Sequence, residues 1–314
     1  MDKALLSGFI KTEALKTGFA DCGIARARFL PDEAERMEKW LSEGMQADMK
    51  YLERNKEKRY DPAKLVEEAR SVITVLYNYY PEKKLPEEDN YKISKYAYGK
   101  DYHYIVKQKL ALLQSAIEAK TGKRKARLFV DSAPVLDRAW ARQSGLGFIG
   151  KNTMLIHKKK GSFHFIGHII LDLELAYDEA EINNYCGSCT LCIDACPTKA
   201  LEPFNLDARK CISYLTIENR GEIDTKFKGK MADWIFGCDI CQDVCPWNRF
   251  SSPHNEPLFD LPAELAQMKK NDWETLDNAR FKSLFKGSAV ERTGFKGLKR
   301  NIDFVAENTN FGLT

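Results

Sequence analysis

The chain has 314 residues, enough to bury one large core or two linked ones, and its 44% hydrophobic and 30% charged content is ordinary for a soluble protein. It shows neither a signal-peptide apolar region nor an apolar run of membrane-spanning length, so we expect a cytoplasmic, reducing location. The net charge of +4 is too small to indicate nucleic-acid binding by itself.

The first quarter of the chain alternates predicted helices with predicted strands. An amphipathic helix is expected over residues 3–18, a short strand over 23–27 and a second helix over 31–41. Another helix is predicted from 62 to about 69. The apolar, β-branched segment 72–77 is typical of a buried strand.

The same alternation continues toward the middle of the chain. Residues 81–90 combine two prolines with a charge run, which is typical of a surface loop. A long amphipathic helix is expected over 101–120 and a strand over 128–130. We then expect a helix over 134–145, with proline in its first turn and glycine at its end, and one or two strands over 163–175.

These patterns divide the chain into three expected parts. Residues 1–180 form an α/β layered domain, 181–250 a cysteine-rich module and 251–314 a helical, basic tail. From Arg280 onward, seven Lys or Arg residues accompany three acids, and His157–Lys160 forms a second basic cluster. Each cluster is most simply a solvated face, with phosphate contact as the alternative.

Eight of the nine cysteines lie between residues 186 and 245. They form the runs Cys186-x2-Cys189-x2-Cys192-x3-Cys196-Pro197 and Cys238-x2-Cys241-x3-Cys245-Pro246, with Cys211 between the two runs. The first run has the spacing of bacterial ferredoxins, in which the fourth cysteine binds the other of two clusters. We therefore assign one [4Fe–4S] cluster to Cys186, Cys189, Cys192 and Cys245, and the second to Cys196, Cys211, Cys238 and Cys241.

Other interpretations of the cysteines fit less well. A structural zinc site takes paired C-x2-C steps, so a third cysteine two residues further on is surplus to it. Disulfides would require an oxidising compartment, for which the sequence gives no indication. The ninth cysteine, Cys22, is expected to be a small buried hydrophobic residue.

Two clusters carry single electrons, and a pure carrier would need the cysteine-rich module only. The preceding 180 residues are therefore expected to hold a second redox centre or a substrate, and a positioned acid. Asp131 is the best candidate, because it follows a predicted strand where α/β sheets place ligands. Burial there is expected to raise its pKa. Helix capping is the alternative, although Ser132 is equally well placed to cap.

Three further segments contain residues suited to a site. Asp101 opens a helix and could serve as its N-cap. Tyr102 and His103 are proton-transfer types, with a structural role favoured on sequence grounds. Arg59 lies next to a turn, where surface solvation is the default and anion binding the alternative.

With these motifs in view, the chain resembles epoxyqueuosine reductase, a cobalamin-dependent tRNA-modifying enzyme family, and more remotely corrinoid reductive dehalogenases. The resemblance covers nearly the whole chain in order. It rests on Lys58–Pro62, Tyr98–His103, Val130–Ala139, Gly145–Asn152, Gly161–Ser162, both cysteine runs and Cys211–Glu218.

The resemblance implies a cobalamin-binding α/β domain, a ferredoxin-like module with two [4Fe–4S] clusters and a basic helical tail. It implies reduction of the epoxide of epoxyqueuosine to queuosine at the wobble position of tRNA, with Asp131 as the proton donor. Family members commonly continue into helical repeats, which we do not expect within residues 251–314. The residues that match corrinoid contacts are Arg59, Ser94, Asp131, Leu155, Ile166, Ser213 and Asp239.

The partners implied are a tRNA anticodon loop and an electron donor of the flavodoxin or ferredoxin type, and we expect a monomer without membrane association. Lys and Arg residues of 280–300 and 158–160 would then contact phosphates. Two alternatives stay open: a dehalogenase-like reductase of a small molecule, and a ferredoxin-type electron-transfer protein without corrinoid.

Overall fold

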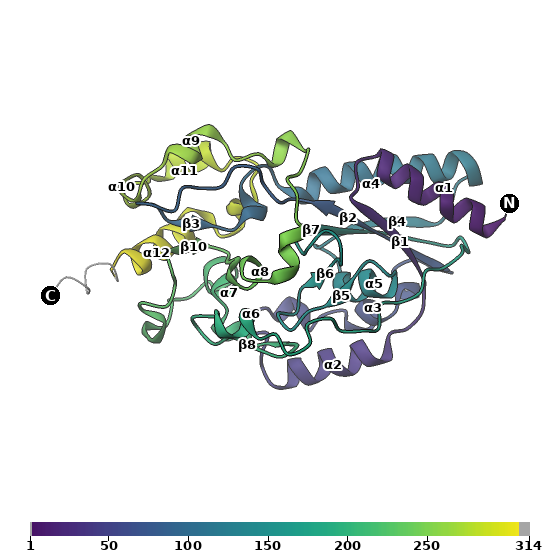
Figure 1. Cartoon of the computed structure of the whole chain (residues 1–314), viewed down its shortest axis with the longest axis horizontal. Helices are drawn as coiled ribbons and strands as arrows, with labels where there is room; N and C mark the ends of the chain where they lie inside the picture. The colour runs from purple at the N-terminus through teal and green to yellow at the C-terminus, as the bar shows by residue number, and fades with distance from the viewer. Residues whose placement is uncertain (1, 308–314) are drawn as a thin grey trace.

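A computed structural model describes residues 2–307 and is built around a four-stranded sheet (Figure 1). The strands lie in the order β1 (Asp21–Arg26), β2 (Ser71–Asn78), β7 (His164–Leu171) and β4 (Ala126–Val130). All three pairings are antiparallel. The strands expected from the sequence are present, but the sheet lacks the parallel strands of a doubly wound fold, so the layered domain is α+β.

The two faces of the sheet are covered by different helices. In β2, Ile73, Val75 and Tyr77 pack in one core with α1 (Lys3–Lys16) and α4 (Tyr102–Thr121), while Val72 packs with residues of α5 (Asp137–Gln143). This alternation follows from the two-residue period of a strand, and both layers are visible in Figure 1.

Two predicted helices differ from the structure. The helix expected over 62–69 is a single 3-10 turn, Pro62–Lys64, which follows α3 (Lys56–Tyr60). The helix expected to begin at residue 134 begins at Asp137, because residues 131–134 form a series of bends that starts with Asp131 in a left-handed conformation. The second helix, α2 (Pro31–Ser42), begins with its proline as expected.

The cysteine-rich module consists of short elements joined by loops. A parallel pair, β10 with β3, connects it to the segment that precedes α4. The module and its neighbours contain β3 (Lys92–Ile93), β5 (Phe148–Ile149), β6 (Leu155–Ile156), α6 (Leu191–Asp194), β8 (Leu201–Glu202), β9 (Asn205–Leu206), α7 (Ile212–Ile217), β10 (Trp234–Phe236) and α8 (Ile240–Asp243).

The tail is helical, as predicted, and is part of a second hydrophobic core. It contains α9 (Ala263–Gln267), α10 (Lys270–Glu274), α11 (Asn278–Leu284) and α12 (Gly294–Ala306). Leu298 and Ile302 pack with Phe236 and the β3 segment. The buried Asn301 amide donates to the carbonyls of Thr216 (2.8 Å) and Ile235 (2.9 Å). The domain boundaries at residues 180 and 250 stay a prediction. Residues of the tail and of the cysteine-rich module pack in one hydrophobic core across the boundary at residue 250.

Within residues 2–307, no helix is long and apolar enough to cross a membrane.

The approach of β1 to the end of α5 requires a residue without a β-carbon at position 23. A methyl group on Gly23 would lie 2.1 Å from the Ser144 carbonyl oxygen. We expect Gly23→Ala to reduce the free energy of unfolding by about 1–3 kcal/mol, measured by anaerobic thermal denaturation.

The matched control is Gly8→Ala, in α1, where an added methyl group meets nothing within 4 Å. This change should leave stability unchanged or raise it by about 1 kcal/mol through helix propensity. Equal melting temperatures for the two variants would contradict the close approach at Gly23.

Candidate active site and cluster cavities

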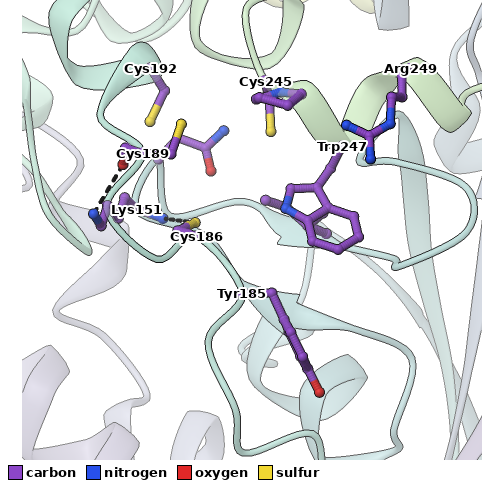
Figure 2. Close-up of a pocket in the computed structure, with 11 residues that line it drawn as sticks. Lys151, Tyr185, Cys186, Cys189, Cys192, Cys245, Trp247 and Arg249 are labelled. Carbon is purple, nitrogen blue, oxygen red and sulfur yellow. Dashed lines mark hydrogen bonds between the residues drawn. The ribbon is translucent and has the colours of Figure 1, made fainter.

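Four cysteines from both runs line one cavity. Cys186, Cys189 and Cys192 come from the first run and Cys245 from the second, and together with seven other residues they line a cavity of about 210 Å³ (Figure 2). This is the set that the crossed ferredoxin pattern predicted. In Figure 2 the sulfur atoms lie around a common space at which α6 and the start of the 3-10 helix Pro246–Phe250 meet.

Backbone and side-chain amides hold the first run in place. The Cys186 N–H bonds to the Asn184 side chain, and the Cys189 N–H bonds to the Cys186 carbonyl. The Lys151 N–H approaches Cys186 Sγ at 3.4 Å, and Lys151 Nζ donates to the carbonyls of Gly187 and Cys189. Donors to cysteine sulfur are one means by which a protein tunes the potential of a cluster.

The second set of cysteines is recognised by its electrostatics. Burial raises the pKa of Cys238, and the neighbouring Cys211 and Cys196 raise it further. Burial also raises the pKa of Cys241, with added contributions from Cys238 and Cys211. Cys238 and Cys241 therefore feel the charge of Cys211, and Cys238 also that of Cys196; the assignment of these four cysteines to one cluster stays a prediction.

The two sets suit a cluster better than a single metal ion. Thiolates around zinc lie about 2.3 Å from the metal, which leaves no room for a cavity between them. All nine cysteines lie among the described residues, and none of them forms a disulfide. Cys22 stands apart, 5% exposed and with a pKa raised by burial to about 12, which confirms it as a buried hydrophobic residue.

Asp131 lies at the end of β4 with a backbone φ of +50°. Its carboxylate accepts a 2.5 Å hydrogen bond from Tyr102 Oη and lies 3.6 Å from His103 Nε2. The N-cap of α5 is Leu136, which makes no side-chain capping bond. Neither Asp131 nor Ser132 caps this helix, so the capping alternative is wrong.

The predicted direction of the Asp131 pKa is also wrong. The surrounding protein would raise the pKa, but the interactions with His103 and Tyr102 outweigh this and hold it below its ordinary value. Burial lowers the pKa of His103, but Asp101 and Asp131 overcome that effect and raise it to about 9. At neutral pH the proton therefore resides on His103, beside an ionised Asp131.

The start of α4 orients both proton-bearing side chains. Asp101 caps the helix, as expected, by accepting a 2.9 Å bond from the His103 N–H. The same carboxylate oxygen lies 2.7 Å from His103 Nδ1. The Tyr102 ring stacks on Phe165 with centroids 4.0 Å apart and an interplanar angle of 5°. Tyr102 and His103 thus both approach the Asp131 carboxylate, and a role for them beyond the structural one that the sequence favoured stays a prediction.

Residues that match corrinoid contacts lie on both sides of the junction between sheet and module. Ser94 and Asp239 are each 2% exposed, and the Ser94 hydroxyl bonds to the Asp239 carboxyl. Arg59 is buried in α3; one Nη bonds to the Tyr51 carbonyl at 3.1 Å, while its Nε is buried without a partner among the described residues. Such an unsatisfied donor fits a site that receives a polar ligand.

The remaining assigned positions are apolar or lie next to a cysteine. Leu155 in β6 and Ile166 in β7 belong to one small hydrophobic cluster. Ser213 is in the first turn of α7, two residues after Cys211. Their roles toward a corrinoid stay predictions.

One buried cation was missed by the sequence reasoning. Lys95 is 6% exposed, and its Nζ lies 2.7 Å from Asp243 and 3.3 Å from Asp239. Burial raises the pKa of Asp239 even in the presence of Lys95. The sequence offered no signal for this contact, because 144 positions separate Lys95 from Asp239.

Two family models match the chain. Residues 59–132 match "Epoxyqueuosine reductase QueG, DUF1730", and residues 185–248 match a "4Fe-4S double cluster binding domain". An epoxyqueuosine reductase of Cellulophaga algicola is 54% identical over 95% of this chain and 97% of its own length. The chain belongs to the epoxyqueuosine reductase family. A Pseudomonas aeruginosa member is 38% identical over 96% of this chain and 85% of its own.

Solved structures of this family share the fold. One epoxyqueuosine reductase, described with an epoxyqueuosine-modified tRNA-Tyr stem loop, has a TM-score of 0.88 and 29% identity, and covers 97% of this chain and 81% of its own. The Streptococcus thermophilus enzyme has a TM-score of 0.86 and 31% identity, with 96% and 80% covered. A Bacillus subtilis structure of the family is described with an aspartate catalytic loop swung out of the active site.

The paired carboxylates predict an unusual titration for His103. Its ring should lose its proton near pH 9, because Asp101 and Asp131 favour the charged form. Replacing Asp101 with Asn should move this titration toward the ordinary value of about 6.5, as measured by 15N NMR of the imidazole. Asp32→Asn, on exposed α2, serves as the control. A wild-type titration near 6.5 would contradict the described geometry.

Proposed function

We propose that this protein reduces the epoxide of epoxyqueuosine in tRNA to the alkene of queuosine, using cobalamin and two [4Fe–4S] clusters. Asp131 carries the proposal, because its carboxylate is held between a phenol and a protonated imidazole at the end of β4. Family membership supports the reaction class and the substrate. The reaction consumes two electrons and two protons, and the epoxide oxygen departs as water.

The residues of the site supply the proton. At neutral pH His103 is charged and lies within ion-pair distance of Asp131 Oδ2, so it can replace a proton that Asp131 delivers. Tyr102 donates to the same oxygen and fixes its position. Asp131 is ionised in the described structure, and a less solvated environment with substrate bound would favour its protonated form. General acids of this kind contribute about 10²–10⁴-fold to a rate.

The cofactor assignments are supported by different features. The eight module cysteines would hold the two clusters, which supply single electrons. Arg59 and the Ser94–Asp239 pair, with Leu155, Ile166 and Ser213, would hold the cobalamin, which when bound supplies the reducing centre beside the substrate. The unpartnered Nε of Arg59 is the observation that favours a polar ligand there.

The tail is proposed to contact RNA, but through fewer cations than the sequence suggested. Arg300 donates to the carbonyls of Leu215 and Asn219, and Arg292 pairs with Glu218, so both hold the tail against the module. The charge of Arg292 also lowers the pKa of Asp131, which puts this part of the tail near the site. The exposed cations available to phosphates are Lys282, Lys286 and Lys296.

Replacing Asp131 with Asn removes the acid while keeping the shape of the side chain. We expect turnover of tRNA carrying epoxyqueuosine, with cobalamin and a chemical reductant, to fall by about 10²–10⁴-fold. Iron content and corrinoid binding should stay unchanged. Asp32→Asn should retain full turnover, and near-normal turnover by the Asp131 variant would remove Asp131 from the mechanism.

The crossed ligand assignment is tested by single cysteine replacements. Cys245→Ser and Cys189→Ser should perturb the same cluster, although they lie in different runs, while Cys238→Ser should perturb the other. Iron assays on anaerobic protein should give about eight irons per chain in the wild type and about four where one cluster is lost. Mössbauer or EPR spectra distinguish which cluster remains.

Cys22→Ala is the control and should retain both clusters. Matching spectral losses in the Cys238 and Cys245 variants would contradict the crossed assignment. Zinc in place of iron in the wild-type protein would contradict both clusters.

A further inference from the structure

The cavity lined by Cys186, Cys189, Cys192 and Cys245 opens beside a row of aromatic side chains. The ring of Trp247 lies 6.3 Å from that of Tyr185 and 6.1 Å from that of Phe250. Tyr185 and Phe250 are 39% and 40% exposed. The buried Phe148 supports the row from behind, with its ring 5.2 Å from Tyr185 and 5.5 Å from Trp247. Figure 2 shows Tyr185 and Trp247 at this cavity.

Two more apolar side chains are exposed next to the cysteines. Leu191 precedes Cys192 and is 50% exposed, and Val244 precedes Cys245 and is 36% exposed. Leu191 and Val244 adjoin the cysteines in the sequence, and we define the cavity rim as Tyr185, Trp247, Arg249 and Phe250. An exposed apolar group of this kind, rich in aromatic residues and arginine, is typical of a protein contact surface.

Cations lie among the aromatic groups of the rim. The Arg249 guanidinium lies 4.4 Å from the Phe250 ring centroid, and Lys158 Nζ lies 4.9 Å from that of Tyr185. Lys151 and Arg249 line the cavity itself. Within residues 2–307, Lys158 is the one of these three cations that forms an ion pair, with Glu181 at 2.6 Å. The surface therefore carries positive charge that a negatively charged partner would complement.

The positions of the two cysteine sets indicate the order in which electrons would pass through them. The second set includes Cys238, and the next residue, Asp239, contacts Lys95 of the segment that precedes α4. Asp239 is 2% exposed and bonds to the Lys95 N–H, so this end is enclosed. The first set lies behind the exposed rim. An external donor would therefore approach the first set and be separated from the site by the second.

We propose that the cavity rim is the docking surface for a small acidic one-electron carrier protein of the flavodoxin or ferredoxin class. In each encounter the donor loses one electron and the cluster held by the first cysteine set gains it, so one turnover requires two encounters. Apolar contact with the aromatic row gives affinity, and the unpaired cations increase the rate of encounter. This inference rests on the proposed function, because it assumes that the clusters transfer electrons to the site.

The test uses the anaerobic, cluster-loaded protein and a purified acidic flavodoxin. The double variant Arg249→Glu, Phe250→Ser should raise the Kd for flavodoxin at least about tenfold, a change of about 1.4 kcal/mol, measured by calorimetry at low salt. Reduction of the clusters by reduced flavodoxin, followed by absorbance, should slow in parallel. Reduction by dithionite should stay unchanged, because a small reductant does not need the docking surface.

The chain offers a matched control in which an exposed Arg and Phe are also adjacent. Arg28 and Phe29 lie in the loop between β1 and α2, and Phe29 is 51% exposed. Arg28→Glu, Phe29→Ser should leave flavodoxin binding and both reductions unchanged. Raised ionic strength should weaken binding to the wild type more than binding to Arg249→Glu, which provides a second measurement with a single surface change.

Unchanged flavodoxin affinity in the Arg249, Phe250 variant would overturn the proposal, as would an equal loss in the control. Loss of tRNA affinity with intact flavodoxin binding would assign the rim to RNA instead and also overturn it. Failure of the proposed function is distinguishable, because it would appear as absent turnover with dithionite while the binding difference remained.

Discussion

The structure depends on the meeting of two cysteine runs that lie some fifty residues apart in the sequence. Each run contributes one cysteine to the set that belongs mainly to the other run. Cys245 joins the first run across the cavity, and Cys196 belongs with the second. Because α6 and α8 must face each other for this exchange, the intervening segment with α7 and β10 is fixed against β3 and the tail. The exchange thereby connects the cysteine-bearing loops to the core that carries Lys95 and Asp239.

On the other side of the junction, four side chains from two parts of the chain meet. Asp101 orients His103, His103 and Tyr102 both reach Asp131, and Asp131 stands on the edge strand β4. In the proposed mechanism the proton is therefore held by a set of neighbouring groups, instead of by one carboxyl with a raised pKa. In this proposal the His103–Asp131 pair can return a proton to the reacting carboxyl at neutral pH, where an isolated aspartate would be deprotonated.

The sequence predicted those features that are encoded in local spacing. The cysteine sets followed from short intervals and a known crossing rule, and Asp131 followed from its place at the end of a strand. It could not predict the left-handed turn that delays α5, since bends over 131–134 are set by contacts of the surrounding fold. It could not predict the burial of Lys95 with Asp239 and Asp243, or the sign of the Asp131 shift, because both depend on side chains distant in the chain.

The left-handed backbone conformation of Asp131 affects both the stability of the enzyme and its activity. A side chain in the left-handed region costs on the order of 1 kcal/mol relative to glycine, and aspartate tolerates it better than most. The fold bears that cost at the one position where it needs a carboxylate to project from β4 toward the phenol and imidazole of α4. A glycine at position 131 would remove this conformational cost and stabilise the fold, but the enzyme would lose its acid. Selection for stability and selection for turnover therefore oppose each other at this residue.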